Sequence, residues 1–247
     1  MNVLVTRPIH QADTLCALIE QQGGQAIRFP TLDIVAIDNG KLSQQLVTMN
    51  EWDWLVFISS NAVNFALLAN NGKIDAFKES AIAAVGKATA KALHSAGLNV
   101  DLLPETHFNT EGLLATDEMK QVNGKKCLII RGLGGRERLA NQLQERGAKV
   151  EYMEVYKREI PKVDNMDVNN MLKKQMFDVI TITSGDALKN LMIMVNSELS
   201  GILKAVPLIV ISNRIKQLAE KIGFETIVVT DSPSDAAIIK TVVQMSL

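Results

Sequence analysis

The feature that most constrains the fold of this chain is an internal repeat, in which two kinds of segment each occur twice. Residues 3–32 align without a gap on residues 127–156. A second segment, residues 53–63, aligns on residues 178–188 at nearly the same spacing of about 125 residues. Internal self-similarity at a fixed spacing indicates repeated structural units. The chain therefore has the segment order a-b-a′-b′.

Within these segments, short apolar runs alternate with stretches whose apolar residues recur every three or four positions. The first pattern predicts strands and the second predicts helices. The predicted strands cover residues 3–5, 54–57, 82–84, 100–103, 127–130, 179–182, 208–211 and 226–229. Several helical stretches end at a glycine, which is a C-cap signal. Continuously apolar strands that alternate with helices predict parallel sheets with helices on both faces.

The repeat order also predicts how the strands divide into domains. The contiguous b and a′ segments predict one α/β domain over residues 42–148. The b′ segment then needs the N-terminal a segment as its partner, which predicts a discontinuous α/β domain of residues 1–32 plus 162–247. The chain would cross between domains at residues 33–41 and 149–161, two extended segments that could pair as a two-stranded ribbon. We expect two similar parallel-sheet, flavodoxin-like domains.

Small, hydroxylic and cationic residues follow the predicted strands, where helices begin. Ligands of open parallel sheets bind beyond the carboxyl ends of the strands. Helix N-termini at that edge offer free N–H groups and a positive dipole end, which suit carboxylates. The candidate substrate-binding residues are Arg7, Ser59, Ser60, Asn61, Lys87, Thr89, Arg131, Ser184, Ser212 and Arg214. The alternative is that each Ser, Thr or Asn only caps its helix.

Composition and motifs exclude several classes of protein. The net charge of −1 gives no basic field for nucleic acid. Cys16 and Cys127 are interpreted as small buried hydrophobes, and the three histidines lack metal-ligand spacing, so we expect no metal. The glycine-rich run at 132–135 lacks the dinucleotide fingerprint because position 137 is glutamate. With no signal peptide or long apolar run, we expect a cytoplasmic protein without membrane contact.

An ordered series of short motifs resembles the uroporphyrinogen-III synthase family. The motifs are VTRP at 5–8, DWLVFISSNAV at 53–63, AVGKATAKAL at 84–93, P-x-x-x-x-N-T-E-G-L at 104–113, RGLGGRERLA at 131–140, VYKR at 155–158, TS-x-x-A at 183–187 and DSPS at 231–234. They span nearly the whole chain in the family's order. The resemblance implies two α/β domains, one of them discontinuous, joined by a two-stranded ribbon.

The resemblance also implies a reaction. The family cyclises hydroxymethylbilane, a linear tetrapyrrole with eight carboxylates, to uroporphyrinogen III in porphyrin and haem biosynthesis. Ring D is inverted, water is lost, and no cofactor is needed. By the same resemblance, Tyr156 assists loss of the hydroxide by donating a hydrogen bond, and Thr89 and Ser184 match family positions. From position alone, Tyr156 is instead interpreted as a half-buried strand residue that packs.

The chain departs from the family pattern in the loop at 211–216. Ile215 stands where the family has a hydroxyl, and Ser212 or Arg214 could take over its contact. Two other functions are open: a two-domain binding protein that closes on an anionic small molecule without chemistry, and a regulatory domain that senses a tetrapyrrole or nucleotide. As a partner of the enzyme, the upstream bilane-forming enzyme is also open, through a transient contact.

Overall fold

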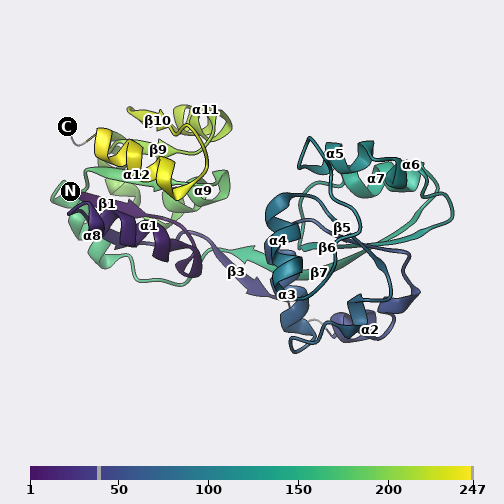
Figure 1. The fold of residues 1–247 in the computed structure, drawn as a ribbon. Coiled ribbons are helices and arrows are strands. Elements are labelled where there is room, and N and C mark those ends of the chain that lie inside the picture. The colour runs from purple at the N-terminus through teal and green to yellow at the C-terminus, as the bar shows by residue number, and fades with distance from the viewer. Residues whose placement is uncertain (38–39, 246–247) are drawn as a thin grey trace. The chain divides into compact units, whose positions relative to one another are not determined.

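The chain forms two compact units, each built around its own sheet (Figure 1). The computed structural model describes residues 1–37 and 40–245. Unit 1 consists of Met1–Asp33 and Glu159–Leu247, and unit 2 is Ile34–Arg158. Helices alternate with mostly parallel strands in both units, which confirms the predicted α/β class.

Unit 1 has a five-stranded sheet with the order β10-β9-β8-β1-β2. The strands are β1 (Asn2–Val5), β2 (Gln25–Arg28), β8 (Val179–Ile182), β9 (Leu208–Val210) and β10 (Ile227–Val229). Every neighbouring pair is parallel. Numbered along the chain within this unit, the order is 2-1-3-4-5, which is that of flavodoxin-like sheets.

Helices cover both faces of this sheet because successive strand side chains point to opposite sides. Val3 and Val5 pack with α1 (Ile9–Gln21) and α12 (Asp235–Gln244). Leu4 points the other way, into a core shared with the remaining helices. These are α8 (Met166–Lys173), α9 (Gly185–Met194), η3 (Ser197–Leu199), α10 (Ser200–Ala205) and α11 (Asn213–Ile222).

Unit 2 has a sheet with the order β3-β7-β6-β4-β5. The strands are β3 (Asp33–Ala36), β4 (Trp54–Phe57), β5 (Ala81–Ala84), β6 (Lys126–Gly132) and β7 (Lys149–Glu159). Beyond β5, the predicted strand at 100–103 is reduced to a parallel bridge between Ala83 and Leu102. This bridge stands where β10 stands in unit 1, so the second sheet is a circularly permuted version of the first.

The helices of unit 2 also lie on two faces of its sheet (Figure 1). One face carries α2 (Lys41–Val47), η1 (Met49–Glu51), α3 (Ser60–Ala69), η2 (Asp75–Phe77) and α4 (Lys87–Ser95). The other carries α5 (Thr110–Ala115), α6 (Asp117–Lys120) and α7 (Arg138–Glu145). Across the described parts of both units, no helix combines the length and apolarity that a bilayer span requires.

The two expected crossing segments contain β3 and β7, which are neighbours in the sheet of unit 2. The N–H of Ile37 donates to the carbonyl of Val155 at 3.2 Å. Because β7 also pairs with β6 along most of its length, the ribbon is a continuation of this sheet. Residues 38–39 of the first segment, like residues 246–247 of the expected discontinuous domain, lie outside the described residues.

The matched aspartates of the repeat have the same structural role in both units. The Asp53 carboxylate accepts the N–H of Lys126, at the start of β6, at 2.8 Å. The Asp178 carboxylate accepts the N–H of Asn2, at the start of β1, at 2.6 Å. Each aspartate thus ties the strand that follows it to a neighbouring strand of its sheet, which explains why the repeat keeps this residue.

Candidate functional site

In unit 2 the candidate residues gather at the carboxyl edge of the sheet. Because β5, β4, β6 and β7 run in parallel, the ends of these strands and the helices that follow them share one edge. The residues at this edge are Ser59, Ser60 and Asn61 at the start of α3, Lys87 and Thr89 at the start of α4, Arg131 near the end of β6 and Tyr156 in β7. The unit therefore brings seven of the eleven predicted site residues to one edge.

Tyr156 is among the largest fully buried side chains of the chain, with 2% of its surface exposed. Its ring centroid lies 5.5 Å from that of Phe65 in α3. A register shift between β6 and β7 sets Gly132 opposite it. Its hydroxyl oxygen is 3.3 Å from Ser59 Oγ. The ring is thus part of the core, more deeply buried than its position suggested, while the hydroxyl reaches the start of α3.

Three of the four predicted serines cap helices. Ser59 Oγ accepts the N–H of Ala62 at 3.1 Å, and Ser184 Oγ accepts the N–H of Ala187 at 3.0 Å. Ser212 Oγ caps α11 in the same way at 3.4 Å. Capping by these three residues is therefore observed. It does not exclude a ligand, because a capping hydroxyl keeps its own hydrogen and a second lone pair.

The remaining polar residues of this edge differ in accessibility. Lys87 is exposed, and its ammonium lies 4.3 Å from the centroid of the Phe108 ring. Thr89 is only 4% exposed, one turn into the same helix. Ser60 and Asn61 are half-buried in the first turn of α3. Lys87 is thus a cation that an incoming carboxylate can reach without displacing a charged partner seen in the described residues.

Arg131 is buried and engaged by the glycine-rich loop that follows it. It is 3% exposed, and its Nε donates to the carbonyl of Gly132 at 3.1 Å. One Nη donates to the carbonyl of Gly134, and the other lies 3.2 Å from Glu137 Oε1. The guanidinium also stacks over the Tyr152 ring, 4.5 Å from its centroid. Arg131 therefore orders this loop, and a substrate carboxylate would have to compete for it.

Tyr152 and Glu137 complete this cluster. The Tyr152 hydroxyl donates to the Glu137 carboxylate, and this bond is the main cause that lowers the pKa of Glu137. Burial, followed by the bond to the carboxylate, raises the pKa of Tyr152 to about 12. Both effects keep the phenol neutral and the carboxylate charged at neutral pH. The cluster is therefore a neutralised ion pair that stabilises the loop.

In unit 1 the candidates lie at the corresponding edge, after β1, β8 and β9. Arg7 forms an ion pair with Asp235 in the first turn of α12, and both side chains are largely buried. Arg214 is exposed in the first turn of α11. A carboxylate ligand could approach Arg214 directly, whereas at Arg7 it would compete with Asp235.

The departure from the family loop is explained by packing. Ile215 is 2% exposed and belongs to the core beneath α9 and α11. A side chain at this position therefore points into the unit, where an isoleucine buries apolar surface. Ser212 caps the helix and Arg214 lies at its exposed start, so these two residues stay candidates for the contact of the missing hydroxyl.

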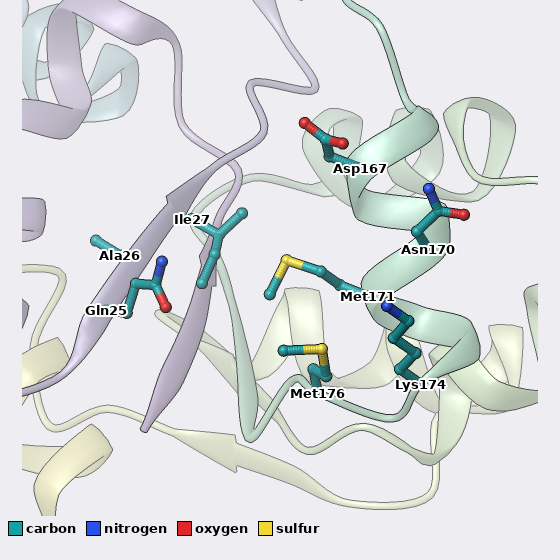
Figure 2. Close-up of a pocket in the computed structure, with 8 residues that line it drawn as sticks. All are labelled: Gln25, Ala26, Ile27, Asp167, Asn170, Met171, Lys174 and Met176. Carbon is teal, nitrogen blue, oxygen red and sulfur yellow. The ribbon is translucent and has the colours of Figure 1, made fainter.

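A hollow of about 570 Å³ lies elsewhere in unit 1, between β2 and α8 (Figure 2). Figure 2 shows the side chains of Met171 and Met176 directed towards Ile27. The other lining residues are Gln25, Ala26, Asp167, Asn170 and Lys174. No predicted site residue lines this hollow. Within residues 1–37 and 40–245, no three His, Cys, Asp or Glu side chains gather as a metal site.

Sequence reasoning missed the residues that shape the surroundings of Tyr156. Phe65 was visible only as an apolar residue of a helix, and Gly132 only as part of a failed dinucleotide motif. The gapless repeat does hold a signal for Gly132, because it aligns with Pro8. A position that holds glycine in one copy only can mark a close approach specific to that copy.

Comparisons with known proteins agree with this geometry. The family model described as Uroporphyrinogen-III synthase HemD matches residues 13–240. The uroporphyrinogen-III synthase of Escherichia coli K12 is 30% identical over 245 residues, which cover 97% of this chain and 99% of that protein. The putative uroporphyrinogen-III synthase of Methanocaldococcus jannaschii is 30% identical over 234 residues, 92% of each chain.

Solved structures of such enzymes share the fold. The uroporphyrinogen-III synthetase of Helicobacter pylori 26695 superposes with a TM-score of 0.66 at 17% identity, over 99% of this chain and all of the other. A mutant uroporphyrinogen III synthase of Thermus thermophilus gives a TM-score of 0.65 at 14% identity, over 99% of both chains. Motifs, fold and full-length relatives agree, and the chain belongs to the uroporphyrinogen-III synthase family.

Proposed function

We propose that this enzyme of porphyrin biosynthesis cyclises hydroxymethylbilane to uroporphyrinogen III, and that Tyr156 acts on the leaving hydroxyl. The observation that carries the proposal is the position of the Tyr156 hydroxyl, 3.3 Å from Ser59 Oγ at the carboxyl edge of the unit 2 sheet. That edge also holds the exposed Lys87 and the N-termini of α3 and α4. A polar donor thus lies beside groups suited to carboxylates.

The acidic side chains of the bilane are the groups that these residues would hold. The first N–H groups of a helix have no partner within the helix, and the dipole at that end favours negative charge. Candidate contacts in unit 2 are Ser60, Asn61, Lys87, Thr89 and Arg131. In unit 1 the candidates are Arg7, Ser184, Ser212 and Arg214, each after the end of a strand. Lys87 and Arg214 are expected to contribute most, because both are exposed.

The chemistry begins at the terminal hydroxymethyl group. Its carbon–oxygen bond breaks, the pyrrole nitrogen supplies the electron pair, and the nitrogen proton is released as an azafulvene forms. The oxygen leaves as water once it has gained a proton. A phenol that donates a hydrogen bond to this oxygen stabilises the charge that develops on it. The substituted α-carbon of ring D attacks the azafulvene and gives a spiro intermediate. The bond from that carbon to the methylene carbon next to ring C then breaks, and this methylene carbon bonds to the other α-carbon of ring D, which loses its proton. Ring D is thereby inverted.

The decisive experiment is to incubate the purified protein with freshly prepared hydroxymethylbilane and to separate the product isomers by chromatography. Spontaneous closure gives isomer I, whereas the proposed activity gives isomer III at a rate proportional to enzyme concentration. A protein that binds the bilane and leaves isomer I as the only product would contradict the proposal and support the binding-protein alternative.

Salt dependence tests the proposed mode of recognition. Exposed charge pairs are screened over about 10 Å at 0.1 M salt. We therefore expect affinity for uroporphyrinogen III to weaken as salt rises from about 0.05 to about 0.5 M. The variants Lys87→Ala and Arg214→Ala should reduce this dependence, since each removes an exposed cation. Affinity that does not change with salt would show that recognition rests on apolar contacts.

We also propose a cytoplasmic location and a small anionic substrate, without nucleic acid or membrane partners. The net charge of −1 fits this proposal. A transient contact with the upstream bilane-forming enzyme would protect an unstable substrate. The test mixes the two purified enzymes, adds an excess of a reagent that reacts with free bilane, and measures the fraction of isomer III that still forms. Equal trapping with and without the upstream enzyme would argue against it.

A further inference from the structure

The internal repeat gives Ser59 a natural comparison within the same chain. Ser59 and Ser184 are equivalent positions, and both cap a ten-residue helix by accepting the N–H three residues on. The gapless alignment of residues 3–32 on 127–156 matches Tyr156 with Leu32. The cap is therefore common to both units, whereas the phenol that touches it is a property of unit 2.

The helix cap uses only one lone pair of the Ser59 hydroxyl, so the hydroxyl can also form a hydrogen bond with the phenol of Tyr156. One lone pair of Oγ accepts the N–H of Ala62 at 3.1 Å. Among the residues that the structure describes, the other partner of the Ser59 hydroxyl is the Tyr156 oxygen, 3.3 Å away. Either oxygen could donate to the other. If Tyr156 donated, its only hydrogen would be used within the protein. If Ser59 donates, the Tyr156 hydrogen is left for a ligand.

We propose that Ser59 is a positioning residue that donates to the Tyr156 oxygen and so directs the Tyr156 hydrogen towards the substrate. The proposal rests on the proposed function of Tyr156 as the donor to the leaving hydroxyl. It describes a chain of three hydrogen bonds that runs from the N–H of Ala62 to Ser59 Oγ, from Ser59 to the Tyr156 oxygen, and from Tyr156 to the substrate.

The first hydrogen bond of this series, from the N–H of Ala62, strengthens the last one, from Tyr156 to the substrate. The N–H of Ala62 lies in the first turn of α3, where the helix dipole is positive. Hydrogen bonds in series polarise one another, by roughly 10–30% per bond. A Tyr156 oxygen that accepts from Ser59 therefore has a more polarised O–H and is a better donor to a developing hydroxide. A serine that only capped α3 would have no such effect on turnover.

The kinetic test uses Ser59→Ala, Ser59→Thr, Tyr156→Phe and the double variant Ser59→Ala/Tyr156→Phe. Loss of one neutral hydrogen bond from the transition state corresponds to roughly a fivefold to tenfold lower kcat. We expect this loss in Ser59→Ala with KM unchanged, and recovery in Ser59→Thr, which keeps both the hydroxyl and the cap. In the Tyr156→Phe background, Ser59→Ala should have no further effect on kcat.

A control separates the positioning role from the loss of a helix cap. Thr116 caps α6 in the same unit, with its Oγ1 3.4 Å from the N–H of Met119. Thr116→Ala removes that cap from a different helix than the one that Ser59 caps, and it should leave kcat unchanged. Thermal melts of all variants identify any that are unfolded at the assay temperature.

A spectroscopic readout tests the contact without any turnover. The chain has two tyrosines, Tyr152 and Tyr156, so ¹³Cζ-labelled tyrosine gives two signals that Tyr152→Phe assigns. Ser59→Ala should shift the Tyr156 signal, and Ser59→Thr should restore it. An unmoved signal, a normal kcat in Ser59→Ala, or an equal loss of kcat in the Tyr156→Phe background would each overturn the positioning role.

These outcomes are distinct from failure of the proposed function. A wild-type protein that yields only isomer I contradicts the activity, whatever the Ser59 variants do. An active wild-type protein with an unaffected Ser59→Ala variant leaves the activity intact and overturns the role of Ser59 alone.

Discussion

The backbone of Gly132 lies directly against the ring of Tyr156, and a Cβ atom at position 132 would be 2.4 Å from Cε2 and 2.5 Å from Cζ. Real Cβ atoms essentially never come closer than 3.0 Å to another heavy atom. The ring is buried and lies beside Phe65, so it cannot move aside without disturbing the core. Gly132 is thus required for space, and it fixes where the phenol lies.

We therefore expect Gly132→Ala to lower both stability and turnover. Overpacking a core of this kind costs about 1–3 kcal/mol, and any shift of the ring moves the hydroxyl away from Ser59. Urea unfolding and the rate of isomer III formation measure the two effects. Gly201→Ala is the control, since its Cβ meets nothing within 4 Å and it lies in α10. It should be neutral or slightly stabilising. A Gly132→Ala protein with normal stability would show that the ring adapts.

Tyr156→Phe should reduce turnover more than any single Ser or Thr change at the site. A positioned proton donor typically contributes about 10²–10⁴-fold to rate. The substitution keeps the ring and its packing, so the free energy of unfolding should fall by only about 0.5–1.5 kcal/mol for the lost hydrogen bond. Steady-state kinetics measure the turnover, and a thermal melt measures the stability and shows that the variant is folded. If a folded Tyr156→Phe enzyme works at a near-normal rate, Tyr156 is a packing residue.

Stability should fall in acid partly through Asp53. Its pKa is lowered mainly by the backbone N–H of Lys126 and then by the Lys125 ammonium. Since the folded pKa is below the unfolded value of about 3.9, the stabilisation is complete above that pH and is lost as pH falls below it. Asp53→Asn should lower stability at pH 7 and flatten its pH dependence below about pH 4. Lys125→Ala should have a smaller effect, because the ammonium is the lesser cause.

The two cysteines should resist alkylation and disulfide reagents in the folded protein. Burial raises the pKa of Cys127 to about 11 and also raises the pKa of Cys16. The reactive thiolate is therefore scarce at pH 8, and both residues are inaccessible. Titration with a chromogenic disulfide should report no fast-reacting thiol in native buffer and two in denaturant. Rapid modification of the native enzyme would show local opening around β6 or α1.

Sequence patterns predicted most of the sheet, and the exceptions have physical causes. The strands that were predicted are continuously apolar, because helices cover both their faces. Strand β2 was missed since it is an edge strand with the sequence Gln-Ala-Ile-Arg, whose ends are exposed. The run at 100–103 forms only one bridge. There the Asp101 carboxylate accepts the N–H of Ile82 at 2.7 Å, so a side chain replaces a backbone carbonyl as the acceptor of a β5 N–H.

The candidate site was predicted as positions along the chain, without the partners of its side chains. The repeat aligns Arg7 with Arg131, yet Arg7 pairs with a residue 228 positions away and Arg131 with one six positions away. Such partners depend on how loops pack and leave no pattern in the sequence. The contact between Ser59 and Tyr156 spans 97 positions for the same reason.

Strand β1 lies inside its sheet between β2 and β8, yet β8 is synthesised far later than β1, since Val3 pairs with Val179. All strands of unit 2 are synthesised before β8, so unit 2 can fold during translation while β1 and β2 still lack their other partner strands. Two strands alone are marginally stable in water. The segment of β1 and β2 is therefore synthesised before unit 2 yet is among the last parts to become native, which makes it strongly dependent on protection from aggregation.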